Sequence, residues 1–192
     1  LGDSLGDAQI QLTANGKPRL LLAAQPTSVS TIEHQFWSCD SNCLQAGGWS
    51  KTVVVEAGTP FFPSDAENTQ SFALDAQGRP RFVFQSNDVG SGVALVGAHL
   101  AACDSACSSA SQWRLVQLDE NQWKNAVLAI NPQGLPRIAY SMMQAAEPWA
   151  VPVISYLECG TRDCTTGVNR MTLAITTTDG TLSTATFAMR LT

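Results

Sequence analysis

Short apolar runs separated by a glycine turn recur three times along the chain. In the copy at 72–84, two apolar runs flank the sequence Gly-Arg-Pro-Arg, and drifted copies occupy 10–22 and 128–140. Apolar runs of this length around such a turn predict a β-hairpin. The glycine is expected to supply a positive φ angle, and the proline to stand where the second strand begins. The recurring turn residues, for which we expect a structural role, are Gly16, Arg19, Gly78, Arg81, Gly134 and Arg137.

A close pair of cysteines follows each hairpin at a nearly constant distance along the sequence. The turn glycines are 62 and 56 residues apart, and the first cysteine of each pair lies 23, 25 and 25 residues after its glycine. Two motifs in nearly constant register establish an internal repeat, and each repeat contains apolar runs for four strands. In the second repeat these strands are expected at about 71–75, 81–86, 93–102 and 113–118.

Repeats of this size and strand number resemble the blades of β-propeller repeat proteins of the secreted, extracytoplasmic type. The resemblance covers nearly the whole chain and implies an all-β fold in one segment, 1–192. Its parts would be three four-stranded antiparallel blades at about 8–57, 70–119 and 125–178, and the first strand of a fourth at about 184–192. A propeller has 4–8 blades, so we expect this chain to be part of a larger propeller. The alternatives are an open stack of three sheets and a ring built from several copies.

Composition narrows the range of partners. The 192 residues carry a net charge of −5, only 14% of them are charged, and no run of lysine or arginine occurs. Nucleic acid is therefore not an expected partner, because phosphate binding requires clustered cations. No apolar stretch reaches the ~18 residues of a membrane-spanning helix, so no membrane span is expected.

Six cysteines in three close pairs indicate an oxidising compartment, and hence a secreted protein or one in the periplasm or at the cell surface. The repeat selects a pairing within each turn between third and fourth strands: Cys39–Cys43, Cys103–Cys107 and Cys159–Cys164. Zinc is the alternative, since His34 and His99 precede two of the pairs. Their offsets from the first cysteine, five and four residues, turn the two imidazoles to opposite strand faces. We therefore expect neither a metal site nor a cofactor.

Alternating strand direction divides the connections between two ends of the sheets. The glycine and cysteine turns share one end, and the longer, non-repeating loops share the other, where binding residues are usually found on a rigid scaffold. Aromatic and acidic residues gather in these longer loops, and the candidate binding residues are Phe61, Phe62, Asp65, Asp88, Glu120, Trp123, Glu147 and Trp149. Such a set can seat a protein partner, stack on a sugar ring or help to hold Ca²⁺. Alternatively, the acids only solvate the loops, and Trp123 and Trp149 close the core between blades.

An arginine opens the second strand of every repeat, and an aspartate recurs in the cysteine turns. We expect each arginine to fork onto the aspartate of the adjacent turn, because guanidinium and carboxylate groups match in geometry. A ring of anion-binding arginines is the alternative. The expected pairs are Arg19–Asp40, Arg81–Asp104 and Arg137–Asp163.

No nucleophile elbow, phosphate-binding loop, dinucleotide fingerprint or zinc-protease motif occurs in the sequence. We therefore expect a non-enzymatic, extracytoplasmic interaction or structural module, whose partner is a protein or a larger envelope assembly, with glycans as a further ligand class. The alternative is an incomplete part of a glycan-active propeller hydrolase, since glycosidases use paired carboxylates. Its acids would come from Asp65, Asp88, Glu120 and Glu147.

Overall fold

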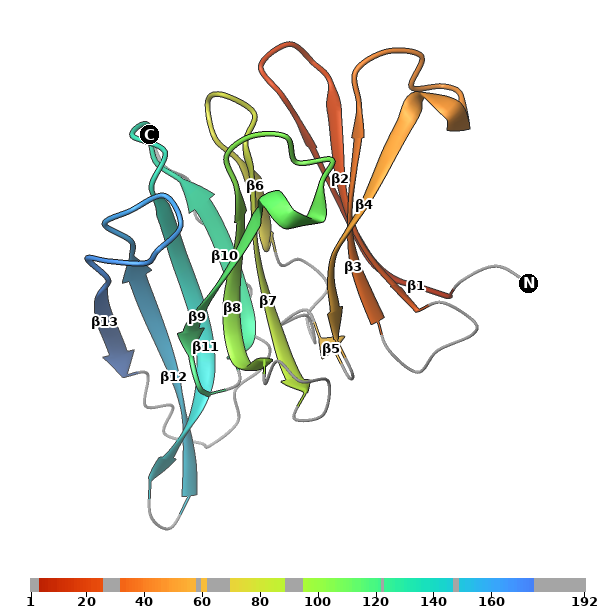
Figure 1. The fold of residues 1–192 in the computed structure, drawn as a ribbon. Helices are drawn as coiled ribbons and strands as arrows, with labels where there is room; N and C mark the ends of the chain where they lie inside the picture. The colour runs from red at the N-terminus through yellow and green to blue at the C-terminus, as the bar shows by residue number, and fades with distance from the viewer. Residues whose placement is uncertain are drawn as a thin grey trace.

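The computed structural model describes residues 4–25, 32–57, 60–61, 70–88, 95–121, 123–146 and 149–174. Nearly all of them lie in or between antiparallel strands, and the helical segments among them are two single 3₁₀ turns, η1 (Ala46–Gly48) and η2 (Ala110–Gln112). None of the described helices is long and apolar enough to cross a membrane. The all-β class predicted from the sequence is confirmed, and the strands form three separate, open sheets (Figure 1).

The first and third sheets have the same construction. The first contains β1 (Ser4–Leu12), β2 (Pro18–Gln25), β3 (Ile32–Cys39) and β4 (Trp49–Ala57). The third contains β10 (Trp123–Ile130), β11 (Pro136–Ala146), β12 (Trp149–Glu158) and β13 (Asn169–Ala174). In both sheets each strand pairs antiparallel with the next one along the chain. The further strand expected at about 184–192 lies outside the described residues.

The second sheet differs in its first strand, which is divided into two short pieces, β5 (Pro60–Phe61) and β6 (Phe72–Leu74). Both pieces pair antiparallel with the same edge of β7 (Pro80–Asp88), and β8 (Leu95–Cys103) and β9 (Trp113–Asp119) complete the sheet. The second sheet thus begins at Pro60, earlier than the boundary near 70 expected from the sequence. Two paired residues are too short a run for an apolar pattern to mark.

The break in the second sheet falls where the other two sheets have a β-bulge. On β1 the register shifts between Leu5 and Ala8, and on β10 it shifts between Trp123 and Asn125. Counted from the proline that begins the second strand, both shifts lie at nearly the same position as the break after Phe61. A bulge accepts an extra residue while the rest of the ladder keeps its pairing. The repeat therefore takes its insertion at a point that is already irregular.

Two apolar layers hold the three sheets together, face to face. The layer between the first and second sheets consists mainly of Leu21, Ala23, Phe36, Val55, Phe72, Phe82, Phe84, Ala101 and Trp113. The layer between the second and third sheets consists mainly of Val83, Ala98, Leu100, Trp123, Ala126, Leu128, Ile138, Tyr140 and Leu157. Because alternate residues of a strand point to opposite sides of its sheet, the second sheet buries both of its faces.

The first strands of neighbouring sheets lie next to one another. The Gln9 amide on β1 donates to Ser71 Oγ at 2.8 Å, and its oxygen accepts the backbone N–H of Phe72 at 3.0 Å. The backbone N–H of Leu128 on β10 donates to the Gln70 carbonyl at 2.8 Å. Each sheet therefore presents its first strand to the same side of the molecule.

The glycine turns and cysteine turns lie at one end of the sheets, as the alternation of strand direction predicts. In Figure 1 the β1–β2, β6–β7 and β10–β11 turns are at the upper end, together with the β3–β4, β8–β9 and β12–β13 turns.

Each cysteine turn is closed by the disulfide predicted from the repeat. The bonds are Cys39–Cys43, Cys103–Cys107 and Cys159–Cys164, with Cα separations of 5.7, 5.8 and 4.8 Å. Loops this short contribute about 2 kcal/mol each on a chain-entropy model. The predicted pairing is confirmed.

Candidate binding surfaces

The glycine turns are capped by the polar side chain at their start. Asp75 Oδ1 accepts the backbone N–H groups of Gln77 and Arg79 at 2.9 and 3.0 Å. Thr13 and Asn131 provide the equivalent caps in the other two sheets. The turn glycines have φ between 72° and 80°, a region that favours glycine. The capping residue was not predicted from the sequence, although threonine, aspartate and asparagine are typical at the start of a turn.

The recurrent arginine ties the second strand of each sheet to the adjacent cysteine turn. Its Nη1 donates to the carbonyl of the preceding proline and to the carbonyl of the first cysteine, over 2.6–3.1 Å. The sets are Arg19 with Pro18 and Cys39, Arg81 with Pro80 and Cys103, and Arg137 with Pro136 and Cys159. The same donor atom serves the same two carbonyls three times, which favours a structural role over an anion-binding ring.

The carboxylate partner of this arginine changes along the chain. Arg19 and Arg81 form the expected ion pairs, the first at 2.8 Å from Asp40 and the second with Asp104. The prediction is wrong in the third sheet, where Arg137 Nε lies 3.3 Å from Glu158 Oε1 and not beside Asp163.

Asp163 binds the neighbouring sheet instead. Its Oδ2 lies 2.8 Å from Arg114 Nη1 on β9, and Thr165 Oγ1 donates to its Oδ1 at 2.8 Å. Burial by itself would raise the pKa of Asp163, but these hydrogen bonds outweigh it and lower the pKa to about 2. The third turn is one residue longer, and its aspartate precedes the second cysteine, whereas the other aspartates follow the first. That shift carries the carboxylate toward the second sheet.

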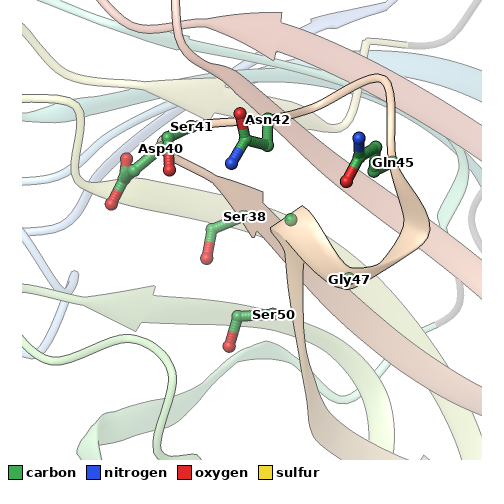
Figure 2. Close-up of a pocket in the computed structure, with 8 residues that line it drawn as sticks. Ser38, Asp40, Ser41, Asn42, Gln45, Gly47 and Ser50 are labelled. Carbon is green, nitrogen blue, oxygen red and sulfur yellow. The ribbon is translucent and has the colours of Figure 1, made fainter.

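A shallow polar hollow of about 400 Å³ lies against the first cysteine turn (Figure 2). It is lined by Ser38, Asp40, Ser41, Asn42, Gln45, Gly47, Gly48 and Ser50. Ser38 and Ser50 face each other across β3 and β4, and Asn42 stands at φ 56° in the turn. The hydrogen bond from Arg19 lowers the pKa of Asp40, the ionisable group of this lining. Hydroxyl and amide groups in this arrangement can hydrogen-bond a polar ligand.

The second cysteine turn has an equivalent but smaller hollow of about 230 Å³. Its lining is Ala102, Asp104, Ser105, Ser111, Gln112, Arg114 and Asp163. Arg114 on β9 lies directly opposite Ala102 on β8, at the position where Ser50 lies opposite Ser38 in the first sheet. Its ion pair with Asp163 reaches the third sheet. In this second hollow, two of the polar groups, Arg114 and Asp163, therefore join the second sheet to the third.

The loop residues predicted to bind a partner are spread over several strand ends. Phe61 ends β5, Asp88 ends β7 and Trp149 begins β12. Glu120 is exposed directly after β9. The remaining predicted loop residues, Phe62, Asp65 and Glu147, lie outside the described residues. Of the predicted set, the side chains of Glu120 and Trp123 are described.

Trp123 is a core residue, which is the second of the two roles that the sequence left open for it. It is fully buried, and its ring stacks on that of Tyr140 with 3.7 Å between centroids. Its backbone N–H donates to Gln85 Oε1 at 2.6 Å, and its Nε1 donates to Asp119 Oδ2 at 3.2 Å. Trp123 therefore closes the core between the second and third sheets. Its place at the boundary of loop and strand left both roles open in the sequence.

Both histidines lie in the layer between the first and second sheets, on either side of Phe84. The rings of His34 and His99 each lie 5.2 Å from that of Phe84. They point to opposite faces of their own sheets, as expected, and on adjacent sheets this brings them into one layer. Burial lowers the pKa of His34 to about 3 and also lowers that of His99.

The cysteines are not available as zinc ligands, because all six are in disulfides. Within the described part of the chain, no group of three or more histidine, cysteine, aspartate or glutamate residues converges as a metal site would require.

The outer side of the first sheet carries exposed apolar side chains. Ile10 and Leu12 on β1 are 60% and 62% exposed, and Leu20 and Trp37 continue the cross-strand row from Ile10. Strand alternation places this row opposite Leu21, which faces the second sheet. We define the outer apolar face as Ile10, Leu12, Leu20, Leu22, Trp37 and Trp49.

No model of a known protein family matches this chain, and no curated protein matches it.

Proposed function

We propose that this chain is a segment of a β-propeller that acts outside the cytoplasm as a non-enzymatic interaction or structural module. Three repeated antiparallel sheets packed face to face support the propeller arrangement, as do first strands that lie next to one another. In a propeller, sheets of four strands stand around a common axis.

The disulfides support a location outside the cytoplasm. All three close short loops, and the described residues contain no free cysteine. Bonds of this kind persist in secreted and periplasmic proteins and are rare in a reducing cytosol.

The main support for an interaction function is the outer apolar face. It combines the exposed aliphatic residues Ile10 and Leu12 with the half-buried indoles of Trp37 and Trp49. Trp37 Nε1 donates to Gln35 and Trp49 Nε1 donates to the Cys43 carbonyl, so both rings are held in place. Ordered aromatic groups within an apolar patch are typical of protein interfaces.

Site-specific photo-crosslinking tests this function. A photoreactive amino acid placed at Leu12 should give discrete protein adducts in the extracytoplasmic fraction of producing cells. The matched control is the same group at Leu44, which is fully exposed in the first cysteine turn and is not part of the outer apolar face. Equal labelling at both positions would contradict the proposal.

Glycan assays test the enzymatic alternative. Glu120 is the predicted acid with a described, exposed side chain. The purified chain should release no sugar from a panel of polysaccharides. Hydrolysis that disappears in Glu120→Gln would overturn the non-enzymatic assignment.

A further inference from the structure

One cross-strand row occurs in all three sheets at the same register, but its burial differs. In the second sheet the row is Phe72, Phe82 and Ala101, in the third it is Leu128, Ile138 and Leu157, and in the first it is Ile10, Leu20 and Trp37. The rows of the second and third sheets are at most 3% exposed. The row of the first sheet belongs to the outer apolar face.

The molecule itself shows what covers such a row. The row of the second sheet packs against Leu21 and Phe36, which lie on the opposite face of the preceding sheet. The row of the third sheet packs against Val83 and Leu100, which have the same register positions in the second sheet. In both layers the row is thus covered by the same face of the preceding repeat unit.

The third sheet carries one more copy of this covering face. Its row is Val127, Ala139, Tyr156 and Met171, which aligns with Gln9, Leu21, Phe36 and Thr52 of the first sheet. Val127 is buried at one end of the row, Ala139 and Tyr156 are half-buried, and Met171 is 60% exposed. The surface that would fit the outer apolar face is therefore present in the same chain, on the outward side of its last described sheet.

We infer that the outer apolar face binds the third sheet of a second copy of this chain, in a head-to-tail contact. This inference rests on the proposed function and names the partner. The two surfaces are different, so the contact is heterologous, and such contacts form rings if the rotation closes. The described residues of two copies form six sheets, a number within the 4–8 blades of known propellers. A two-copy ring uses both surfaces of each chain.

Sedimentation velocity of the purified, oxidised chain tests the contact, from micromolar to near-millimolar concentration. A species of twice the 20.4 kDa chain mass is expected to form as the concentration rises. Ile10→Asp and Met171→Asp should each abolish it, because each removes one of the two surfaces. Leu44→Asp, a change at an exposed apolar residue outside both surfaces, should leave it unchanged. Circular dichroism confirms that each variant is folded.

Mixing the two variants separates a head-to-tail contact from other pairings. Chains with Ile10→Asp keep the third-sheet surface, and chains with Met171→Asp keep the outer apolar face. A mixture should therefore regain the double-mass species through one intact contact, whereas each variant alone stays at the single mass.

Two results would overturn the inference. A wild-type chain that stays at the single mass throughout the series would exclude a second copy as the partner. It would leave the proposed function standing, provided that crosslinking at Leu12 still captures another protein. A double-mass species that is lost in Ile10→Asp but kept in Met171→Asp would show pairing of two outer apolar faces instead.

Discussion

The outer apolar face of the first sheet has an equivalent in the second sheet, namely the face that the second sheet packs against the inner side of the first. Ile10 corresponds to Phe72, and both lie opposite the second residue after the proline of the following strand, Pro18 or Pro80. Phe72 is fully buried, whereas Ile10 is 60% exposed. Burial therefore follows from the presence of a preceding sheet and not from the residue pattern.

This difference in burial separates the interactions that need a neighbouring repeat unit from those that do not. A side chain contributes hydrophobic free energy only where a neighbouring unit removes it from water. Bonds within one unit, such as the disulfides, do not need a neighbour.

The largest expected effect is at the buried member of the equivalent pair. Phe72→Ala should lower the free energy of unfolding by about 3–5 kcal/mol, because it leaves a cavity in the layer beside Phe36. Ile10→Ala should lower it by less than about 1 kcal/mol, because most of its side chain is already in water. Urea unfolding at low protein concentration measures both. Equal losses would show that Ile10 is covered within a single chain.

Replacing the recurrent arginine should also destabilise the protein more in the second sheet than in the first. Arg81→Met should cost about 3 kcal/mol, because the buried side chain donates to the Cys103 and Arg162 carbonyls, which would lose their charged donor. Arg19→Met should cost about 1 kcal/mol, since the carboxylate of its partner Asp40 is mostly exposed. Thermal unfolding of the two variants provides the measurement. A larger loss for Arg19→Met would show that cover by a neighbouring sheet does not strengthen this interaction.

The disulfides should show no such difference. Replacing Cys39 and Cys43 by alanine, or Cys103 and Cys107, should lower the free energy of unfolding by about 2 kcal/mol in either case. The two loops have the same length, and the gain comes from restricting the unfolded chain. Urea unfolding of the two double variants is the test. Unequal losses would mean that the covering sheet also affects the turn.

The smallest effect is the dependence on pH that His34 introduces. Its folded pKa of about 3 lies below the ordinary 6.5, so between these values the unfolded chain binds a proton that the folded chain does not. The free energy of unfolding should therefore fall as pH is lowered, by about 1 kcal/mol between pH 6 and pH 5. Asp163, with a pKa of about 2, titrates below this window.

Replacing the imidazole checks this assignment. His34→Asn should flatten the pH dependence relative to the wild-type chain in urea unfolding measured across the same window. His99 remains in both proteins, so the difference between the two curves belongs to His34. Parallel curves would show that His34 is accessible to protons in the folded state.

Sequence analysis succeeded where structure depends on neighbours in the chain. The glycine turns and the disulfides follow from short-range geometry, and the strands follow from runs of apolar residues. It failed where the partner comes from another sheet. Asp163 binds Arg114 of the second sheet, and Trp123 of the third sheet is hydrogen-bonded to Gln85 of the second. The short strand β5 was missed because it pairs with β7 over two residues only.

The candidate surfaces were harder to predict than the fold. The outer apolar face has the same alternating pattern as the buried faces, so no local signal distinguishes it. The polar hollow forms where Asn42 takes a positive φ and the η1 turn brings Gln45 and Gly48 close to it. Neither feature is visible in a pattern of apolar and polar positions.

The repeat, most strands of each unit, the turns and the disulfide within each unit are predictable from the amino-acid sequence, because all of these depend on residues that are close along the chain. The apolar row that stays exposed, of three equivalent rows, and the carboxylate that each arginine meets could be identified only in the folded protein. Those outcomes depend on how whole sheets stack, and stacking is set by a unit's neighbours in space and not by its own residues.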